Sequence, residues 1–490
     1  MSSSQRGVVA AGHPLTAQAG ARVLREGGNA VDAAVAAMLT SFVSEALLTG
    51  LGAGGYMMVA GAGVEPTLLD FFAQAPTRLT DGSEAELLAL EVSFGDAEQI
   101  FHIGPASCAA YGTPAGVCEA VRRWGSVPLE QLAEPAVRLA HEGVALNDVQ
   151  AYVAELLEEL LTSTPECAEL WAPGGSVLGE GDTFRSHELG EALARLGSEG
   201  AEPFYRGELA AAVCAWLGQR GGSLRPEDLA GYRAIAREPV SIGYRDRTIL
   251  TNPPPAAGGT LLAYALGLLD RLPAPPSLPG IVTAMRAAQA ERTEDFLEGL
   301  SEAGFLQRFM GSRLGSTTHI SVIDRDGMAC ATTCTNGECS GVVVPGTGIH
   351  LNNMMGEQDL NPHGFHMHPA GRRMPSMMAP TVVMREGEVE LVLGSAGSNR
   401  IRSALLQTIL GVVDRGLGVK EAIEAPRVHF EDGVVFAEPG ISAEELDPEL
   451  EIVRFGARNL FFGGVQAALS RDGVLTGAGD PRRGGAAELA

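Results

Sequence analysis

The feature that most constrains the fold is a hairpin pattern around residue 320. Residues 315 to 327 read Gly-Ser-Thr-Thr-His-Ile-Ser-Val-Ile-Asp-Arg-Asp-Gly. The β-branched side chains of this segment favour a strand, and Asp324-Arg325-Asp326-Gly327 is typical of a hairpin turn. Met328 to Thr335 follow at once and are mostly small or β-branched, as in a strand packed between layers on both sides. The sequence therefore predicts two antiparallel strands in the interior of the molecule.

Thr317 is the candidate reactive residue of this hairpin. Partner positions in an antiparallel pair sum to a constant, so a turn at Arg325-Asp326, or one residue later, leaves three candidate partners for Thr317, namely Cys334, Thr335 and Asn336. A threonine hydroxyl is a weak nucleophile until a base takes its proton. One such base is the α-amine that the same threonine gains when the preceding peptide bond is cut. Because Thr pairs in strands are more often structural, this motif needs support from the rest of the chain.

Further motifs occur along nearly the whole chain. They are Glu26-Gly27-Gly28-Asn29-Ala30-Val31-Asp32-Ala33-Ala34, Gly52-Ala53-Gly54-Gly55-Tyr56, Gly112-Thr113-Pro114, Pro253-Pro254-Pro255 with Gly258-Gly259, Leu351-Asn352-Asn353 and Gly394-Ser395-Ala396-Gly397. Together with Thr317-Thr318-His319 they resemble the γ-glutamyltranspeptidase (glutathione hydrolase) family of N-terminal-nucleophile hydrolases, which are made as one inactive chain. Several motifs in the right order are far more specific than any one of them.

The resemblance implies an α+β fold, the four-layer αββα sandwich of N-terminal-nucleophile hydrolases, as one globule built from two autoprocessed chains. Length alone favours two or three domains for 490 residues, and the resemblance replaces that expectation. It implies cleavage between Ser316 and Thr317, which separates a helix-rich large subunit (residues 1–316) that lines the substrate site from a small subunit (residues 317–490). In this maturation Thr317 Oγ attacks the carbonyl of Ser316, and water opens the resulting ester.

The resemblance also assigns the catalytic groups. Thr317 attacks a substrate amide through Oγ while its α-amine acts as base, and Thr335 hydrogen-bonds Thr317. The backbone amides of Gly397 and Ser398 hold the tetrahedral oxyanion. The local pattern agrees, because residues 388–393 alternate as a strand, residues 394–398 turn, and residues 399–413 carry the apolar stripe of a helix. A helix N-terminus in that place leaves N–H groups directed at whatever lies in front of it.

Substrate contacts are expected from Asn336, Glu357, Ser376 and the position of Phe72. In the family, an Arg at the Phe72 position grips the α-carboxylate of the γ-glutamyl group, and Phe cannot form that bidentate contact. Met377 likewise stands where the family has a second carboxylate-binding Ser. We therefore expect weak recognition of the α-amino-acid head, unless a nearby basic residue replaces the missing Arg; the candidates are Arg372, Arg373, Arg400 and Arg402.

Three functions are consistent with these residues. The first is a γ-glutamyltransferase-like amide hydrolase or acyltransferase that cleaves γ-glutamyl or related acyl amides through an acyl-enzyme. The second is an acylase of the same fold that acts on a non-glutamyl amide, such as a dicarboxylic monoamide or a cephalosporin-type side chain. The third is a non-catalytic binding protein that keeps the fold and is never cleaved. The physiological acyl group, the acceptor, and the balance between hydrolysis and transpeptidation stay open.

Composition limits the partners of the protein. A formal net charge of −25 disfavours nucleic acid and anionic membranes, because both would be repelled. The expected partners are a small-molecule amide or peptide substrate and, for each subunit, the other subunit of the same precursor. No cofactor is expected. A homodimer of the processed unit is possible, and the oligomeric state stays open.

Two groups of residues resemble metal sites, but no metal is expected at either. Cys330, Cys334 and Cys339 near His319 lack the spacing of a zinc ribbon and are interpreted as packed small hydrophobes. The histidines within residues 362–373 have no acidic or thiol ligand at matching spacing. The seven cysteines of the chain are odd in number and irregularly spaced, which predicts reduced thiols.

The first residues, Met1 to Gly7, lead into family-like sequence without the charged and apolar regions of a secretion signal. No apolar run reaches the roughly 18 residues that a membrane-spanning helix needs. Both observations predict a cytoplasmic protein.

Overall fold

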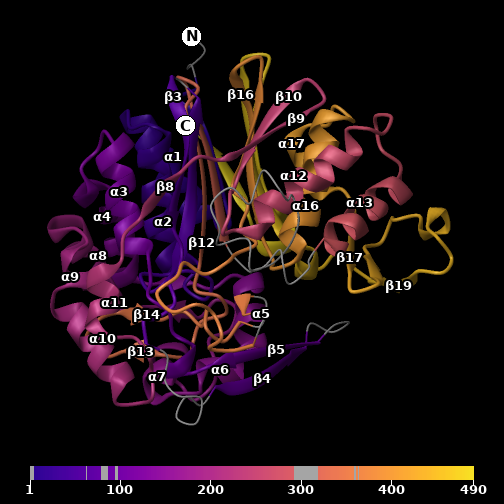
Figure 1. The fold of residues 1–490 in the computed structure, drawn as a ribbon. Coiled ribbons are helices and arrows are strands. Elements are labelled where there is room, and N and C mark those ends of the chain that lie inside the picture. The colour runs from indigo at the N-terminus through magenta and orange to yellow at the C-terminus, as the bar shows by residue number, and fades with distance from the viewer. Residues whose placement is uncertain are drawn as a thin grey trace.

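Two β-sheets lie face to face in the computed structural model, which describes residues 5–61, 63–78, 87–93, 98–291, 318–357, 360–361 and 364–490. Figure 1 shows the strands between two groups of helices, one on the left and one on the right. Ser316 and Thr317 lie outside the described residues. The mixed helix and sheet class expected from the sequence is confirmed.

The first sheet has seven strands, each antiparallel to its neighbours. Its central strands are small, β-branched and buried, as the pattern of residues 315–335 predicts. In order across the sheet the strands are β22 (Ala486–Leu489), β1 (Gly7–Ala11), β11 (Thr318–Asp324), β12 (Ala329–Thr335), β2 (Gly54–Gly61), β3 (Val64–Phe71) and β8 (Ile235–Arg237).

The second sheet has six antiparallel strands and packs against the first. An apolar cluster fills the space between the sheets, with Ile323 and Ala331 from the first sheet and Val392 and Ala468 from the second. In order across the sheet the strands are β21 (Val474–Gly479), β20 (Gly464–Arg471), β16 (Glu388–Ala396), β15 (Thr381–Arg385), β10 (Arg247–Thr251) and β9 (Val240–Tyr244).

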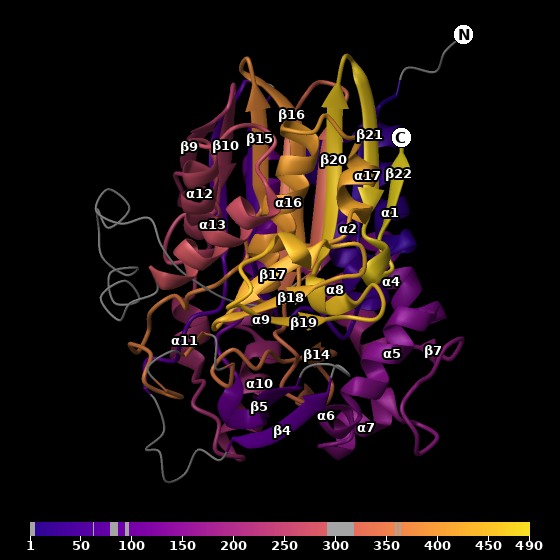
Figure 2. The same cartoon turned by 90° about the vertical axis from the view of Figure 1, so that its right-hand side faces the viewer.

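Helices cover the outer face of each sheet. Helices α1 (Pro14–Glu26) and α2 (Ala30–Ser44) pack on the first sheet. Helices α12 (Ala257–Leu269), α16 (Arg400–Val413) and α17 (Val419–Glu424) pack on the second sheet (Figure 2), and α13 (Leu278–Ala290) packs on α12.

Helix α2 shows why these segments form where they do. Asn29 and Asp32 cap its start reciprocally, since each side chain accepts a 3.0 Å hydrogen bond from the other's backbone N–H. Gly27, at φ 102°, ends the preceding helix in a conformation that suits glycine. Every residue of α2 is buried, as its Ala, Val and Leu content predicts for a helix between a sheet and further helices.

Most of the remaining helices form a supporting layer beyond α1 and α2. The apolar spacing of residues 148–161 predicts one helix, which is divided at Leu157. The composition of residues 284–297 predicts another helix; α13 (Leu278–Ala290) begins earlier, and residues 292–297 lie outside the described residues. The other elements are α3 (Thr113–Trp124), α4 (Leu129–Glu142), α5 (Asp148–Leu156), α6 (Glu158–Leu161), α7 (Pro165–Trp171), α8 (His187–Glu199), α9 (Glu202–Tyr205), α10 (Glu208–Gly218), α11 (Pro226–Gly231) and the short strands β4 (Leu88–Ser93), β5 (Glu98–Ile103), β6 (Val144–Ala145), β7 (Thr183–Phe184), β13 (Val343–Val344), β14 (Ile349–His350), β17 (Val428–Glu431), β18 (Val434–Ala437) and β19 (Glu451–Arg454).

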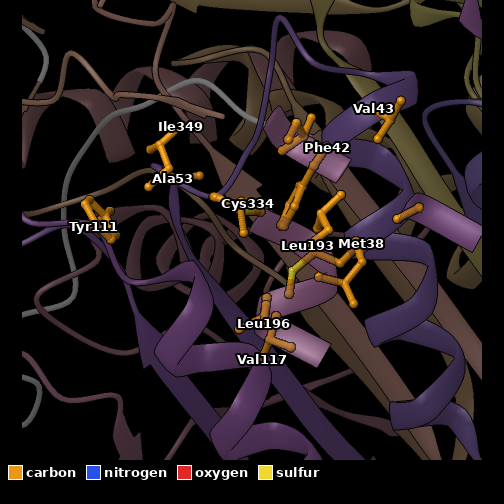
Figure 3. Close-up of a cluster of buried hydrophobic side chains, with 14 of the residues drawn as sticks. Met38, Phe42, Val43, Ala53, Tyr111, Val117, Leu193, Leu196, Cys334 and Ile349 are labelled. Atoms are coloured by element: carbon orange, nitrogen blue, oxygen red, sulfur yellow. The ribbon is translucent and has the colours of Figure 1, made fainter. Parts of the chain in front are cut away.

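The largest apolar core lies between the first sheet and its helices. Figure 3 shows Met38 and Phe42 of α2 and Leu193 and Leu196 of α8 gathered near Cys334 of β12. This placement confirms that Cys334 is a packed small hydrophobe. All seven cysteines carry free thiols.

No helix in the described ranges is both long enough and apolar enough to span a bilayer. No cluster of three or more histidine, cysteine, aspartate or glutamate side chains with metal-binding geometry occurs there either.

Candidate active site

The hairpin has one of the registers that the sequence allows. Thr318 pairs with Cys334 and Ile323 pairs with Ala329 across β11 and β12. Gly327 closes the predicted turn at φ 84°, a conformation that favours glycine. The candidate nucleophile Thr317 and its neighbour Ser316 lie outside the described residues, so Thr318 is the first described residue of the strand.

Alternate residues of β11 face different layers. His319 and Ser321 face the second sheet, where Ser321 Oγ donates a 3.0 Å hydrogen bond to the backbone oxygen of Gln466. The His319 ring bonds the hydroxyls of Thr333 at 2.8 Å and Ser321 at 2.9 Å. Burial lowers the pKa of His319 to about 3, so this ring is neutral at physiological pH and serves the packing of the sheets.

Thr318 points to the helical side, where it meets Glu45. Glu45 Oε2 accepts a 2.7 Å hydrogen bond from Thr318 Oγ1, and Oε1 accepts one of 2.9 Å from Thr16 Oγ1. Burial raises the pKa of Glu45 to about 7, although both hydroxyl bonds oppose the shift. Glu45 was not among the predicted site residues. The one sequence signal for it is an acidic residue placed directly after the apolar helix α2.

Thr335 and Asn336 lie at the end of β12, and both are buried. Thr335 Oγ1 accepts a 2.7 Å hydrogen bond from the backbone N–H of Gly337. Asn336 donates through Nδ2 to Cys339 Sγ at 3.7 Å, and its backbone oxygen accepts a 3.1 Å bond from the N–H of Asn353. The loop after β12 is therefore folded back tightly.

Glu357 lies beside this loop. A Cβ built on Gly337 would meet Glu357 Oε1 at 2.2 Å and Asn353 Oδ1 at 2.0 Å, which shows how closely both side chains approach the backbone there. The structure therefore brings the predicted substrate contacts Asn336 and Glu357 together.

The candidate oxyanion site has the predicted strand, turn and helix. Strand β16 ends at Ala396 and α16 begins at Arg400, while Gly397 and Ser398 between them have φ values of 117° and 55°. A left-handed conformation costs a non-glycine residue such as Ser398 on the order of 1 kcal/mol. The N-terminal end of α16 favours negative charge in front of it.

This turn lies at the end of the sandwich where β11 begins. A Cβ on Gly61 would meet Val389 Cγ2 at 2.7 Å and Gly327 O at 2.2 Å, so the start of β16 lies near the hairpin turn. A Cβ on Gly394 would meet the His319 ring at 2.2 Å, so the later part of β16 lies near the start of β11. Strand β16 therefore runs toward Thr318.

Phe72 occupies an apolar environment just after β3. Its side chain is 1% exposed and stacks on Tyr56, with ring centroids 5.4 Å apart. The cluster that contains both rings also includes Met354, Met374 and Met378. The position where the family has a carboxylate-binding Arg is therefore surrounded by apolar side chains.

Arg373 approaches Phe72, and both of its terminal nitrogens are bonded to the protein, while its Nε has no hydrogen-bond partner among the described residues. Its guanidinium donates to the backbone oxygens of Phe72 at 2.5 Å and Arg233 at 2.6 Å, and its Nε lies 3.4 Å from Asp70 Oδ1. The guanidinium also lies over the Tyr232 ring at 4.5 Å. Arg373 therefore fixes the backbone around Phe72 through both terminal nitrogens, which argues against a bidentate carboxylate clamp at this residue.

Arg400 and Arg402, two of the other candidate arginines, also bond to groups within the protein. Arg400 donates to the backbone oxygen of Phe461 at 3.0 Å and lies over its ring at 4.5 Å. Arg402 donates to Gln289 Oε1 at 3.0 Å. Arg372 is exposed. None of the three is placed beside Phe72 by a described contact.

Ser376 lies between the apolar cluster that contains Phe72 and the apolar core beneath α12. Its Oγ accepts a 3.1 Å hydrogen bond from the N–H of Met378, and its backbone oxygen accepts a 2.7 Å bond from the N–H of Ala257. Met378 joins the cluster of Phe72, whereas Met377 packs in the core beneath α12. Phe72 and Met377 therefore belong to different apolar cores, and the expectation that both changes fall at one subsite stays a prediction.

Comparison with known proteins finds acylases and glutathione hydrolases among the similar sequences. The sequence profile described as gamma-glutamyltranspeptidase matches residues 16–303 and 300–490. The "Acylase ACY 1 proenzyme" of Pseudomonas sp. (strain SE83) is 30% identical over 526 residues, covering 97% of this chain and 92% of that protein. The "Glutathione hydrolase proenzyme" of Escherichia coli (strain K12) is 29% identical over 531 residues, covering 98% of this chain and 91% of that protein.

Solved structures show the same two kinds of relative. The cephalosporin acylase from Bacillus halodurans superposes with a TM-score of 0.84 at 25% identity, covering 99% of this chain and 96% of that chain. The gamma-glutamyltranspeptidase of Helicobacter pylori superposes with a TM-score of 0.51 at 26% identity, covering 61% of this chain and 90% of that chain.

Proposed function

Because the chain belongs to the gamma-glutamyltranspeptidase family, and is an enzyme of that family, we propose that it is an autoprocessed amide hydrolase or acyltransferase with Thr317 as nucleophile. The observation that carries this proposal is the register of β11 and β12. A ladder continued by one residue brings position 317 opposite Thr335, on the face that looks toward the second sheet. The Gly397-Ser398 turn lies at that same end of the sandwich.

Maturation follows from this placement. Thr317 Oγ attacks the carbonyl carbon of Ser316, the bond from that carbon to the Thr317 nitrogen breaks, and the nitrogen takes the hydroxyl proton. Water then hydrolyses the ester, which leaves a carboxylate on Ser316 and a free amine on Thr317. The layers of the described fold support a mature four-layer αββα sandwich built from residues 1–316 and 317–490.

In the mature enzyme the α-amine of Thr317 takes the hydroxyl proton while Oγ bonds to the substrate carbonyl carbon. The oxygen of the tetrahedral intermediate lies against the backbone amides of Gly397 and Ser398, and each such donor is worth about 3 kcal/mol in the transition state. The C–N bond breaks and the amine leaves with the proton. Water or another amine then attacks the ester and restores Thr317.

The acyl group of the substrate is the point where the proposal departs from glutathione hydrolases. Asn336, Glu357 and Ser376 are the proposed acyl contacts, and the apolar side chain of Phe72 faces no free guanidinium among its described neighbours. A desolvated carboxylate without a charge-assisted bond loses about 1.5 to 3 kcal/mol. We therefore propose an acylase that does not depend on an α-amino-acid head.

Processing tests the nucleophile. Purified wild type should give two bands near 33 and 18 kDa on a denaturing gel, since 51.0 kDa over 490 residues is about 104 Da per residue. Thr317→Ala should give one uncleaved, inactive chain, whereas Thr317→Ser should mature slowly and keep some activity, because it retains the hydroxyl and the amine. Two bands from Thr317→Ala would contradict the proposal. A wild type that stays uncleaved would favour the non-catalytic binding protein.

Steady-state kinetics test the acyl group. Glutaryl and γ-glutamyl anilides share a leaving group and differ only in the α-amino group of the acid head. We add valeryl anilide, which has no carboxylate on the acyl chain. An acylase of the proposed kind should favour γ-glutamyl over glutaryl by less than about a hundredfold in kcat/KM, the affinity equivalent of ~2.7 kcal/mol. A larger preference would show that the α-amino group of the head is recognised. A preference for glutaryl over valeryl anilide of about a hundredfold or more would show that the acyl carboxylate is bound and that the interpretation of Phe72 is wrong.

A further inference from the structure

Two histidines face each other among the helices that lie beyond α2. His141 is in the last turn of α4, and His187 is the first residue of α8. Their Nδ1 atoms are 3.0 Å apart, and the two rings are inclined at 42° with centroids 5.3 Å apart. The pair is separated by 46 positions in the chain, so no local motif in the sequence indicates it.

The backbone fixes the start of α8 against the end of α4. The N–H of Ser186 donates a 3.2 Å hydrogen bond to the backbone oxygen of Ala140. The Arg185 guanidinium donates to the backbone oxygen of Glu142 at 2.8 and 3.2 Å. Figure 1 shows α4 and α8 side by side, and the two helices pack against each other. Both imidazoles therefore stand on rigid elements, which is what a preorganised pair of ligands requires.

The His141 ring is held in place by two neighbouring residues of α8. A Cβ built on Gly190 would lie 2.7 Å from Nε2 of this ring and 2.8 Å from Cε1, so glycine lets the ring lie directly on the helix backbone. Glu191 Oε1 lies 3.6 Å from the same Nε2. A carboxylate beside Nε2 favours the tautomer with the ring proton on that nitrogen, because the N–H dipole points at the negative charge. Nδ1 of His141, on the side of His187, then carries a lone pair.

The distance between the two Nδ1 atoms is that of two ligands on one metal ion. Two nitrogens that are each about 2.0 to 2.1 Å from zinc lie about 2.9 to 3.4 Å apart, for N–Zn–N angles between about 90° and about 109°. The observed separation of 3.0 Å falls within this range. A carboxylate on the second ring nitrogen is the usual outer partner of a metal-bound histidine. His187 is exposed and His141 is half-buried, so water can reach the remaining coordination positions.

We infer that His141 and His187 bind a divalent transition-metal ion of the zinc class, with Glu191 as the outer partner of His141. Two protein ligands are fewer than a closed structural zinc site has, so water completes the coordination. Imidazole suits zinc, copper and nickel, whereas calcium and magnesium prefer oxygen ligands. The bound ion joins the end of α4 to the start of α8. The site shares no residue with the proposed reaction centre.

Zinc binding to the purified protein tests the inference. The protein is freed of metal with a chelator and dialysed against ZnCl2 at micromolar free zinc. Wild type should bind one more Zn²⁺ per chain than either His141→Gln or His187→Gln, because Gln keeps a polar group in the pair but offers no imidazole. Zinc held by other histidines, such as those within residues 362–373, is the same in all three proteins and cancels in the difference. Equal zinc content in the three proteins would overturn the inference.

The outer carboxylate gives a second test. Glu191→Gln should keep the two imidazoles but weaken zinc affinity at this site about tenfold to a hundredfold, as expected for a lost outer partner. The matched control is Glu188→Gln, which removes the same charge from the same helix, one position after His187. The control should keep the wild-type affinity. Equal affinities of the two variants would overturn the inference, since Glu191 would then act only through its charge or not at all.

A third measurement uses wild type alone, in case a histidine variant does not fold. Crystals soaked in ZnCl2 should give an anomalous scattering peak about 2.0 to 2.1 Å from both Nδ1 atoms. The lack of a peak there, at a zinc concentration that saturates the protein in dialysis, would overturn the inference. None of the three measurements depends on cleavage before Thr317 or on amide hydrolysis, so failure of the proposed function leaves their expected results unchanged.

Discussion

Glu45 is the titratable side chain that ties the strand of the proposed nucleophile to the helical layer. Its carboxyl group is buried, accepts hydrogen bonds from Thr16 and Thr318, and has its pKa raised by burial from 4.5 to about 7. Between these two pH values the folded chain holds a proton that the unfolded chain has released. The resulting stabilisation is complete below pH 4.5 and is lost as the pH rises through 7.

We predict that Glu45→Gln removes this pH dependence. The free energy of unfolding of the parent should fall by about 3 kcal/mol more than that of the variant as the pH rises from about 4.5 to about 7. Urea unfolding measures it, with both proteins in the uncleaved Thr317→Ala background so that each is a single chain. If the free energy of unfolding changes with pH equally in parent and variant, the pKa of Glu45 is not raised in the folded chain.

Individual residues show where sequence reasoning works and where it stops. The replacement of a carboxylate-binding Arg by Phe72 is visible in the sequence, because a motif fixes the position. The engagement of Arg373 with Asp70 and two backbone oxygens is not visible, because it depends on residues far apart in the chain. Arg373 is 301 positions from Phe72 and 140 positions from Arg233. Glu45 was missed for the same reason, since its partner Thr318 is 273 positions away.

At the scale of elements, the turn between β16 and α16 positions the proposed oxyanion donors. Gly397 has a φ of 117°, and a Cβ there would lie 2.6 Å from the Cα of Gly463. An added methyl group must displace this turn, because backbone cannot yield as a flexible side chain does. The backbone N–H donors of the turn would then no longer point at the position of the oxyanion.

Gly397→Ala should therefore lower kcat about a hundredfold or more, as expected for a lost oxyanion donor. Gly416→Ala is a matched control, since Gly416 also has a positive φ of 67° but its added Cβ would meet no heavy atom within 4 Å. Both variants are assayed with glutaryl anilide after their cleaved fraction is measured on a gel. Equal kcat values for the two variants would show that the turn does not contribute to catalysis.

Local signals predicted most elements of the described fold. Apolar spacing and helix-end signals predict helices over residues 16–25, 30–43 and 399–413, within about two residues of the bounds of α1, α2 and α16, and the Asp-Arg-Asp-Gly turn predicts the hairpin. The division of residues 148–161 at Leu157 and the early start of α13 were not predicted. Both depend on packing against distant segments, which periodicity does not report.

At the scale of the whole molecule, the two sheets meet through a buried histidine. His319 of β11 contacts Gly394 of β16 closely and bonds Thr333 and Ser321. Burial lowers its pKa from 6.5 to about 3. Between these pH values His319 is therefore protonated in the unfolded chain and neutral in the folded chain. The resulting stabilisation is complete above pH 6.5 and is lost as the pH falls toward 3.

We predict that His319→Gln flattens the acid side of the stability profile. Between pH 6.5 and about 5, the Thr317→Ala parent should lose about 2 kcal/mol of unfolding free energy that the Thr317→Ala/His319→Gln variant keeps. Urea unfolding at each pH measures the difference. Equal losses in both proteins would mean that other buried groups, such as His13 and His350 with their lowered pKa values, account for the acid sensitivity.

The last prediction concerns the two products of the proposed cleavage. Strand β1, before the cut, pairs with β11 on one side and β22 on the other, and both of these follow the cut. Strands β2 and β10, before the cut, pair with β12 and β15, which follow it. Each sheet therefore contains strands from both products, and separating them breaks backbone ladders and exposes both sheet faces.

We expect the products to stay together until the whole molecule unfolds. Wild type that gives two bands on a denaturing gel should elute from a native sizing column as one species, with a light-scattering mass of 51.0 kDa or a whole multiple of it, a multiple indicating a homo-oligomer. In urea, the two products should separate at the concentration at which tryptophan fluorescence reports unfolding. Trp124, Trp171 and Trp216 all lie before the cut, so a small product released at lower urea, while that signal stays native, would contradict the interleaved arrangement.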